Sequence, residues 1–186
     1  SAASDVYKRQ DMKLDIQLTQ AGLKNAIRVL RQRQQWLQRK TDELAQELAE
    51  RGMSGARIRF QNAEYDGMKD VSVSVQKTGE NTYAMVAVGS AVLFIEFGTG
   101  IRYAAPAHPD ADRLGYIRGG YGKHQGLKEG GWVYEGASGG THGRAVNNEQ
   151  TKWHTYGNPA NMCMYYTVQD LKRELQQIAK EVFADE

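Results

Sequence analysis

Six residues carry side chains whose chemistry could support a reaction or hold a metal ion. They are His108, His124, His142, His154, Cys163 and Glu96. No two histidines have the three- to five-residue spacing of helical metal ligands, and the gaps that separate His142, His154 and Cys163 match no common zinc pattern. The sequence therefore predicts no metal site.

Cys163 lies between Met162 and Met164, and no histidine follows it in the chain. The residue order of papain-like proteases is therefore absent, and a nucleophilic thiol needs a neighbouring base. We interpret Cys163 as a buried and inert thiol. Glu96 could act as the general acid of a glycosidase-like site, but no second carboxylate can be matched to it. A small hydrolase that uses Glu96, His154 or Cys163 remains an alternative, which convergence of the three side chains in one cleft would favour.

Two glycine-containing segments could contact a phosphate group, and neither has the required spacing. After Gly98-Thr99-Gly100, the third glycine of a dinucleotide fingerprint would fall at Tyr103. After Gly122-Lys123, His124 stands where a P-loop needs Ser or Thr. The sequence predicts no nucleotide site and no cofactor.

The composition describes an ordinary globular chain. Its 186 residues include 24 Lys and Arg against 22 Asp and Glu, so the formal charge of +2 argues against whole-surface attraction to nucleic acid or to an anionic membrane. The longest apolar run, residues 91–95, is far shorter than a membrane span, and a single cysteine favours a reducing compartment. We interpret residues 1–11 as a non-native or disordered leader and residues 12–186 as one domain.

In the first part of that domain, apolar and polar residues alternate, and a helical pattern follows. Leu14, Ile16 and Leu18 predict a strand, and Thr19 predicts a helix cap with Leu18 stapled onto Leu23. An apolar stripe follows, interrupted by Gln34 and Thr41, and it consists of Leu23, Ile27, Leu30, Leu37, Leu44 and Leu48. Gly52 predicts the end of a helix of about 30 residues, a length at which part of the helix projects from the domain or meets another subunit.

The remaining elements predict an α+β fold. Residues 71–75 and 83–88 alternate as a β-hairpin with a loop at residues 77–81, and residues 91–95 fit a strand or a short helix. Residues 98–143 hold 13 of the 20 glycines, with short strands expected at 132–134 and 153–155. A C-terminal helix follows, with Thr167 and Asp170 as its capping box, Tyr166 stapled onto Leu171, and a stripe of Val168, Leu171, Leu175, Ile178 and Val182. We expect it to pack on the sheet.

The predicted first helix separates its charges. The bases in residues 19–40 are Lys24, Arg28, Arg31, Arg33, Arg39 and Lys40, with no acid among them, whereas residues 41–50 carry Asp42, Glu43, Glu47 and Glu50 with no base. This order opposes the helix dipole. We predict a subunit interface through Arg28, Arg31, Glu43 and Glu47; a nucleic-acid-binding module that uses the basic half is the alternative.

One ordered series resembles a known family. Residues 83–100 run from Tyr83 through Ala91-Val92-Leu93-Phe94-Ile95 to Glu96-Phe97-Gly98-Thr99-Gly100. They resemble the minor head–tail joining or tail-completion proteins of tailed bacteriophages, made by siphophages and prophages. Gly157–Tyr166 is similar to the aromatic or proline-rich segment that precedes the family's C-terminal helix, although Cys163 stands where proline is more usual.

The resemblance implies an α+β fold, no enzymatic activity and a homo-oligomeric ring, sixfold like the tail, between head and tail. It implies contacts with neck, tail-terminator or tail-tube proteins, DNA met only as it passes through the ring, and no membrane. The protein would be assembled in the bacterial cytoplasm and reside in the virion. Within the motif, Phe97 would fill the core while Gly98 and Gly100 permit a sharp turn.

The segment at residues 101–150 varies within the family, so the resemblance assigns no role to it. Its composition nevertheless favours a surface that becomes ordered on docking, because aromatic side chains stand among many glycines. We predict a docking loop whose aromatic residues are Tyr116, Tyr121, Trp132 and Tyr134.

Overall fold

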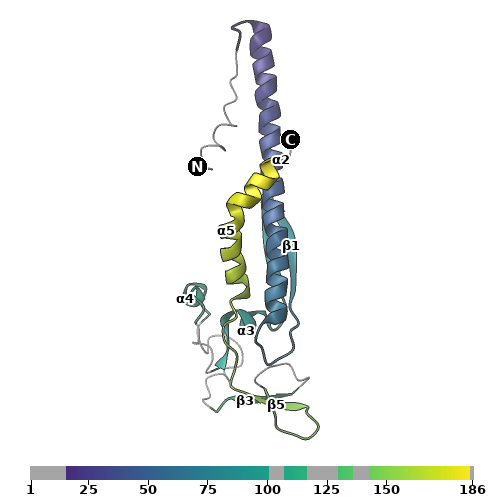
Figure 1. The fold of residues 1–186 in the computed structure, drawn as a ribbon, viewed down its shortest axis with the longest axis vertical. Coiled ribbons are helices and arrows are strands. Elements are labelled where there is room, and N and C mark those ends of the chain that lie inside the picture. Colours follow the sequence, from purple (N-terminus) through teal and green to yellow (C-terminus); the bar gives the residue numbers. More distant parts are fainter. Residues whose placement is uncertain (1–15, 101–106, 117–129, 136–142, 185–186) are drawn as a thin grey trace. The chain divides into compact units, whose positions relative to one another are not determined.

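The computed structural model describes residues 16–100, 107–116, 130–135 and 143–184. The chain divides into two compact units, Ser1–Asp42 and Glu43–Glu186. Helix α2 (Gln20–Asn62) has residues in both units, and all described strands lie in the second (Figure 1). No helix in the described ranges is long and apolar enough to cross a membrane.

The start of α2 agrees with the predicted cap but not with the predicted staple. The Gly22 amide donates to Thr19 Oγ1 at 3.1 Å, so Thr19 is the N-cap as predicted. Leu18 is 93% exposed, so its predicted contact with Leu23 is wrong. Ile16–Leu18 belong to no strand, and residues 12–15 of the predicted strand lie outside the described residues.

The predicted end of this helix at Gly52 is wrong, because α2 continues for ten residues to Asn62. Gly52 is buried where other elements approach: a Cβ there would lie 2.9 Å from Leu171 Cδ1 and 3.2 Å from Met85 Sδ. Beyond it, Ala56, Phe60 and Ala63 are buried at helical spacing. Gly52 is therefore a packing residue, and the helix continues because its apolar face continues.

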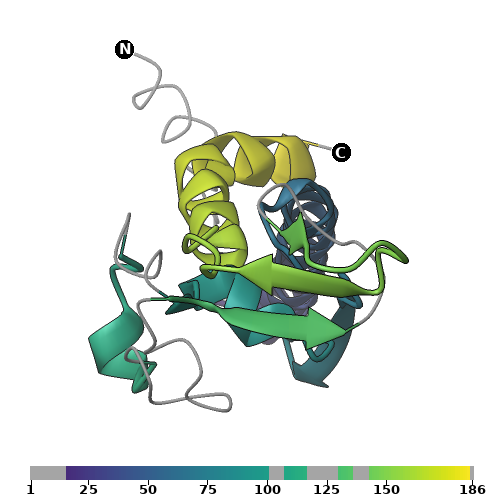
Figure 2. The ribbon, with the colours of Figure 1, turned by 90° about the horizontal axis from the view of Figure 1, so that it is seen from below.

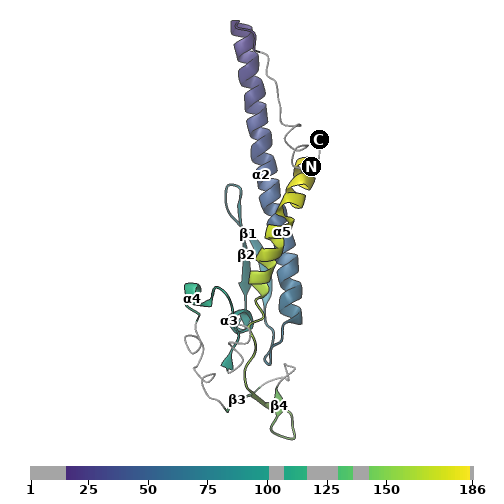
Figure 3. The ribbon, with the colours of Figure 1, turned by 60° about the vertical axis from the view of Figure 1, so that its left-hand side comes forward.

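The predicted hairpin is confirmed. Strands β1 (Ser72–Gly79) and β2 (Thr82–Val88) pair antiparallel, with Val73 opposite Ala87 and a turn shorter than predicted (Figure 3). The Arg57 guanidinium donates two hydrogen bonds, of 2.8 and 3.0 Å, to the carbonyl oxygen of Val73. This arginine fixes the hairpin to the second half of α2.

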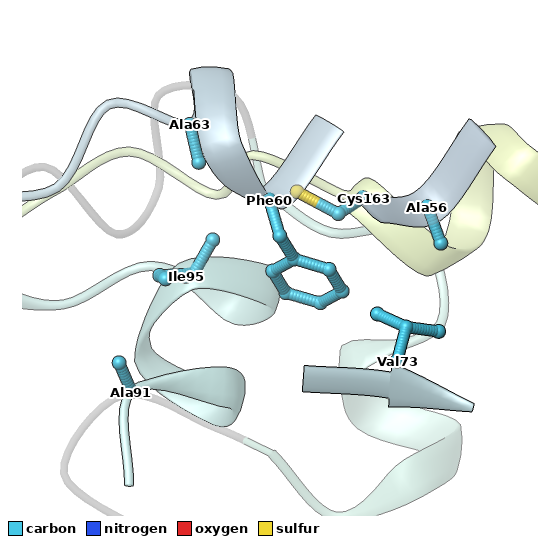
Figure 4. Close-up of a cluster of buried hydrophobic side chains, with 7 residues drawn as sticks. All are labelled: Ala56, Phe60, Ala63, Val73, Ala91, Ile95 and Cys163. Carbon is cyan, nitrogen blue, oxygen red and sulfur yellow. The ribbon is translucent and has the colours of Figure 1, made fainter. Parts of the chain in front are cut away.

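The apolar run that fitted a strand or a helix is helical, and it forms α3 (Val92–Phe97). The Asp70 carboxylate accepts hydrogen bonds from the amides of Ser90 and Ala91, at 2.7 and 2.9 Å, just before α3 begins. The hydrogen bonds at Ser90, with that from Ala91, lower the pKa of Asp70. Ile95 joins a core with Phe60, Val73 and Cys163 beneath α2 (Figure 4).

A second, three-stranded sheet contains both strands predicted in the glycine-rich half. Strand β3 (Trp132–Glu135) pairs antiparallel with β5 (Lys152–Thr155), as Figure 2 shows, and β4 (Arg144–Ala145), which was not predicted, pairs with the other edge of β5. A short helix, α4 (Ala111–Leu114), precedes this sheet.

The C-terminal helix α5 (Cys163–Ala184) begins four residues before the predicted cap, so the capping box is wrong. Thr167 lies inside the helix, where its hydroxyl donates to the Cys163 carbonyl at 2.7 Å, and the expected staple of Tyr166 onto Leu171 falls inside it too. Of the predicted stripe, Ile178 is fully buried, whereas Val168 and Leu175 are about 40% exposed.

Helix α5 packs on α2, and not on the sheet as predicted. Asp170 forms ion pairs with Arg59 and Arg173, and Glu181 pairs with Arg51 at 2.8 Å. Leu171 lies against Gly52. The expectation of a C-terminal helix is therefore confirmed, and its packing surface includes the second half of α2.

Candidate functional site

Glu96, at the end of α3, links three segments from a buried position. Its side chain is 6% exposed. The carboxylate accepts hydrogen bonds from the amides of Met164 and Tyr165, at 2.8 and 3.0 Å, which belong to the first turn of α5. A helix N-terminus has unsatisfied N–H groups and a partial positive charge. Glu96 therefore caps α5 from a distant part of the chain, which explains why α5 starts before its local capping sequence.

His108 is the third partner of Glu96. Its Nε2 lies 3.2 Å from Glu96 Oε1, and its Nδ1 accepts a hydrogen bond from the Asp110 amide at 3.1 Å. Because Nδ1 acts as the acceptor, Nε2 carries the proton and donates to the carboxylate. The ring also packs against Phe97, with centroids 4.5 Å apart, and against Tyr165. This arrangement orients both side chains and gives the carboxylate three hydrogen-bond donors.

The rest of the motif forms a backbone clasp, which we define as Gly98–Gly100 with Gly157–Asn158. The amide of Thr99 donates to the Asn158 carbonyl at 2.8 Å, and the amide of Asn158 donates to the Thr99 carbonyl at 3.1 Å. The Asn158 side-chain amide also donates to Thr99 Oγ1 at 3.2 Å. The two segments thus pair like neighbouring strands although 59 residues separate them in the sequence.

The clasp requires glycine where its backbones meet. Gly98 has φ +78°, and a Cβ there would lie 2.7 Å from the Ala160 nitrogen; at Gly100, with φ +65°, it would lie 2.3 Å from the Tyr156 oxygen. These are backbone atoms that cannot move aside as a flexible side chain can. Phe97 is 4% exposed and stacks on Tyr116 at 4.3 Å. Phe97, Gly98 and Gly100 therefore all serve close packing.

A second buried polar cluster connects the end of α2 to the three-stranded sheet. Asp66 is 1% exposed; its amide donates to Asn158 Oδ1 at 2.8 Å, and its carboxylate accepts from the Thr155 hydroxyl. The Tyr134 hydroxyl donates a hydrogen bond to the carbonyl oxygen of Asp66. Sequence reasoning missed Asp66, because nothing in its neighbours distinguishes it from an ordinary turn aspartate.

Cys163 is buried, as predicted. It is 1% exposed in the core cluster of Figure 4, and burial, with a smaller contribution from the charge of Glu96, raises the pKa of its thiol to about 12. The thiol is therefore protonated near neutral pH and is a poor nucleophile. His154 lies in β5, where its Nε2 contacts the Gly130 oxygen at 2.7 Å and its ring contacts Tyr156. These two contacts of His154 involve neither Glu96 nor Cys163.

The structure bears on the metal prediction only in part. His124 and His142 lie outside the described residues. Across the part of the chain that the structure describes, no group of three or more His, Cys, Asp or Glu side chains could hold a metal ion.

The predicted docking aromatics have different surroundings. Tyr116 is half-buried on Phe97, and Tyr134 contacts Asp66, so both contribute to packing within the second unit. Trp132 is half-buried in β3, and Tyr121 lies outside the described residues. Docking through this set stays a prediction, with Tyr116 and Tyr134 already engaged in the fold.

The predicted subunit interface lies on α2. Arg28 donates to Asn25 Oδ1 at 2.9 Å, and Arg31 and Glu43 are exposed. Glu47 accepts a hydrogen bond of 2.6 Å from Arg51, which also pairs with Glu181. Arg28 and Glu47 thus have partners within their own chain, and the interface stays a prediction.

Four apolar side chains of the first unit are open to solvent on α2. The exposed fractions are 49% for Leu23, 50% for Ile27, 53% for Leu30 and 44% for Leu37. A stripe of this kind on one helix is a typical protein-contact surface.

Comparison of the chain with protein-family models, with curated proteins and with solved structures finds no match. The resemblance of residues 83–100 to phage head–tail proteins therefore stays an expectation drawn from the sequence.

Proposed function

We propose that the chain is a structural protein of tailed-bacteriophage particles, a ring-forming subunit that acts at the head–tail interface or completes the tail end. The observation that carries the proposal is the set of structural contacts made by Glu96–Gly100. Glu96 caps α5, Phe97 is in the core, and Gly98–Gly100 pair with Gly157–Asn158. The resemblance implies a structural role for this motif, with Phe97 in the core and Gly98 and Gly100 at a sharp turn, and these contacts support that role.

Two further features support the proposal. The resemblance implies the order strand, long helix, hairpin, motif and C-terminal helix, and the described elements follow this order from the long helix onward. The half-exposed apolar residues of α2 between Leu23 and Leu37 supply a surface for contact between copies. Subunits that meet around one axis form a closed ring.

The decisive experiment removes the reading frame from the phage or prophage that encodes it. Particles are then examined by electron microscopy. We expect filled heads and separate tails, or tails of abnormal length, and rescue by the wild-type gene supplied in trans. A Gly98→Ala gene should fail to rescue because the clasp cannot close, whereas Gly115→Ala, at a glycine with open space around it, should rescue. Normal infectious particles after deletion would overturn the proposal.

A nucleic-acid-binding module is the second candidate, because the described part of residues 19–40 carries exposed Lys24, Arg28, Arg31 and Arg39 without an acid. Such a module would bind duplex DNA as a monomer, and its affinity would fall steeply with salt. Fluorescence anisotropy with a labelled duplex measures this dependence. Tight, salt-sensitive binding by a monomer together with normal particles in the deletion strain would favour this candidate.

A further inference from the structure

The exposed stripe of the first unit has a seven-residue repeat. Leu23, Leu30 and Leu37 recur every seven residues, and each is followed four residues later by Ile27, Gln34 or Thr41. Alternating steps of four and three are those of positions d and a in a heptad, labelled a to g. The part of this repeat in the unit Ser1–Asp42 spans three heptads, and Leu44 and Leu48 continue it into the second unit, where they are half-buried.

A seven-residue repeat differs from the pattern of a helix packed in a globular core. A straight α-helix has 3.6 residues per turn, so a strict heptad stripe stays on one face only when helices wind around each other. The four apolar members are 44–53% exposed, and Gln34 and Thr41 are exposed as well. The stripe therefore has the spacing of a coiled coil and room for a second helix.

We propose that residues 19–41 of α2 form a parallel, in-register coiled coil with the same residues of other copies of this chain. The proposal rests on the proposed function to the extent that a ring requires contacts between copies. It goes further by naming the segment, its orientation and its register. Copies related by rotation about the axis of the coil itself point in the same direction, as a parallel coil requires.

The two polar a positions point to a second copy as the partner. In a parallel, in-register coil, position a meets position a, so Gln34 lies beside Gln34 and Thr41 beside Thr41. An amide both donates and accepts, so each Gln34 can satisfy its counterpart. Polar residues at a fix register and the number of helices at some expense of stability. An unrelated apolar groove would leave Gln34 without a partner.

The charges that flank the stripe favour the parallel orientation. Positions e are Lys24, Arg31 and Gln38, and positions g are Ala26, Arg33 and Lys40. In a parallel coil, each g faces the e five residues later in the partner, which places Ala26 beside Arg31 and Arg33 beside Gln38. In an antiparallel coil centred on the same stripe, g faces g and e faces e. Arg33 then meets Arg33, and Arg31 meets Arg31, in a repulsive arrangement.

The parallel coil brings the bases of residues 19–40 to the same level in every copy. Their repulsion opposes association, and salt screens it over a Debye length of about 10 Å at 0.1 M. Raising the salt concentration from about 20 mM to about 300 mM should therefore tighten self-association. An interface built on Arg28 and Arg31 against Glu43 and Glu47 would weaken instead. The sign of the salt effect distinguishes the two surfaces.

Association is measured on the full chain by analytical ultracentrifugation. Leu30→Gln with Leu37→Gln should weaken it at least tenfold, because glutamine keeps helix propensity and removes the apolar contact. Ile58→Gln is the matched control, since Ile58 is 58% exposed on α2 but outside the heptads, and it should leave association unchanged. Gln34→Leu should tighten association about tenfold. Circular dichroism checks that each variant keeps its helix content.

Orientation is tested by cross-linking. Under mild oxidation, Leu23→Cys should form a disulfide-linked dimer, because facing d positions of a parallel pair lie within disulfide range. The wild-type chain should not cross-link, since its Cys163 is 1% exposed. A chain that stays monomeric up to about 1 mM in high salt, or Leu23→Cys chains that associate without cross-linking, would overturn the proposal.

The failure of this inference and the failure of the proposed function are distinguishable. A coiled coil in solution together with normal particles after gene deletion would overturn the phage role and leave the coil standing. Defective particles after deletion, with full rescue by Leu30→Gln and Leu37→Gln, would keep the phage role and overturn the coil.

Discussion

Leu30 and Phe60 lie on the same helix but have opposite surroundings: Leu30 is 53% exposed and Phe60 is 2% exposed. The apolar residues that flank Leu30 on its stripe are half-exposed, whereas Ala56 and Ala63, four residues before Phe60 and three after it, are small and buried. Small residues let other elements approach the helix closely. The first pattern suits a partner outside the chain, and the second suits the chain's own core.

The difference shows that one long helix can serve two purposes. Near Phe60, stability of the fold depends on each buried group, because a cavity or an unsatisfied polar atom is costly. Near Leu30, substitutions should alter association and leave the fold alone. The following experiments test this division, starting with the largest expected effect.

Glu96→Ala should destabilise the fold by about 3–5 kcal/mol, because two amides at the start of α5 and the His108 ring lose their buried acceptor. Urea denaturation followed by circular dichroism measures the free energy of unfolding. Glu174→Ala, an exposed glutamate on α5, is the control and should have little effect. A loss below about 1 kcal/mol for Glu96→Ala would mean that α5 does not depend on this cap.

Gly98→Ala should destabilise by about 2–3 kcal/mol, since the new Cβ meets the Ala160 nitrogen and φ is positive. Gly115→Ala separates the two causes: Gly115 also has positive φ, at +75°, but no atom lies within 4 Å of a Cβ placed there. Gly115→Ala should lower the free energy of unfolding by only about 1 kcal/mol. Equal losses at the two positions would show that backbone strain alone, and not the clasp, is responsible.

The buried thiol predicts a pH effect on stability. The pKa of Cys163 is about 12 in the folded chain and ordinarily 9, so above pH 9 the unfolded state loses a proton that the folded state keeps. The free energy of unfolding should therefore fall by up to about 1.4 kcal/mol per pH unit between these values. Urea titrations at several alkaline pH values measure the slope. Cys163→Ala, itself about 1 kcal/mol less stable, should lose this part of the pH dependence; an unchanged slope would contradict the effect.

Leu30→Ala should have the smallest effect on the fold, within about 0.5 kcal/mol, when the protein is dilute enough to be monomeric. The same experiment on Ile95→Ala should show a loss of about 2–5 kcal/mol, because Ile95 is fully buried. If Leu30→Ala were as damaging as Ile95→Ala in the dilute chain, the exposed stripe would be part of the fold rather than a contact surface.

Sequence reasoning succeeded where the determining interactions are local. The alternation of Val73 and Val75 against residues 83–88 predicted the hairpin, and Thr19 predicted the cap of α2, because turn and cap chemistry involve neighbouring residues. The strands around Trp132 and Trp153 were also predicted, and they pair with each other although about twenty residues separate them.

The predictions that failed concern interactions between residues far apart in the sequence. Thr167 looked like a cap, but the cap of α5 is Glu96, 68 residues from the amide that it accepts. Gly52 looked like a stop signal, but it makes room for Leu171 and Met85. Asp66 was missed because its partners come from β3, β5 and the segment after β5. A single sequence contains no record of such pairings.

The pairing of Thr99 with Asn158 has a consequence for how the chain can change. Because the clasp holds both ends of the intervening segment, the entropy of closing that segment grows only with the logarithm of its length, at about 0.6 kcal/mol for each doubling. Away from His108, Tyr116 and Tyr134, which contact the framework, residues can therefore be gained or lost between the two ends at little thermodynamic expense to the helices and the hairpin. One scaffold could in this way present different surfaces while its framework is preserved.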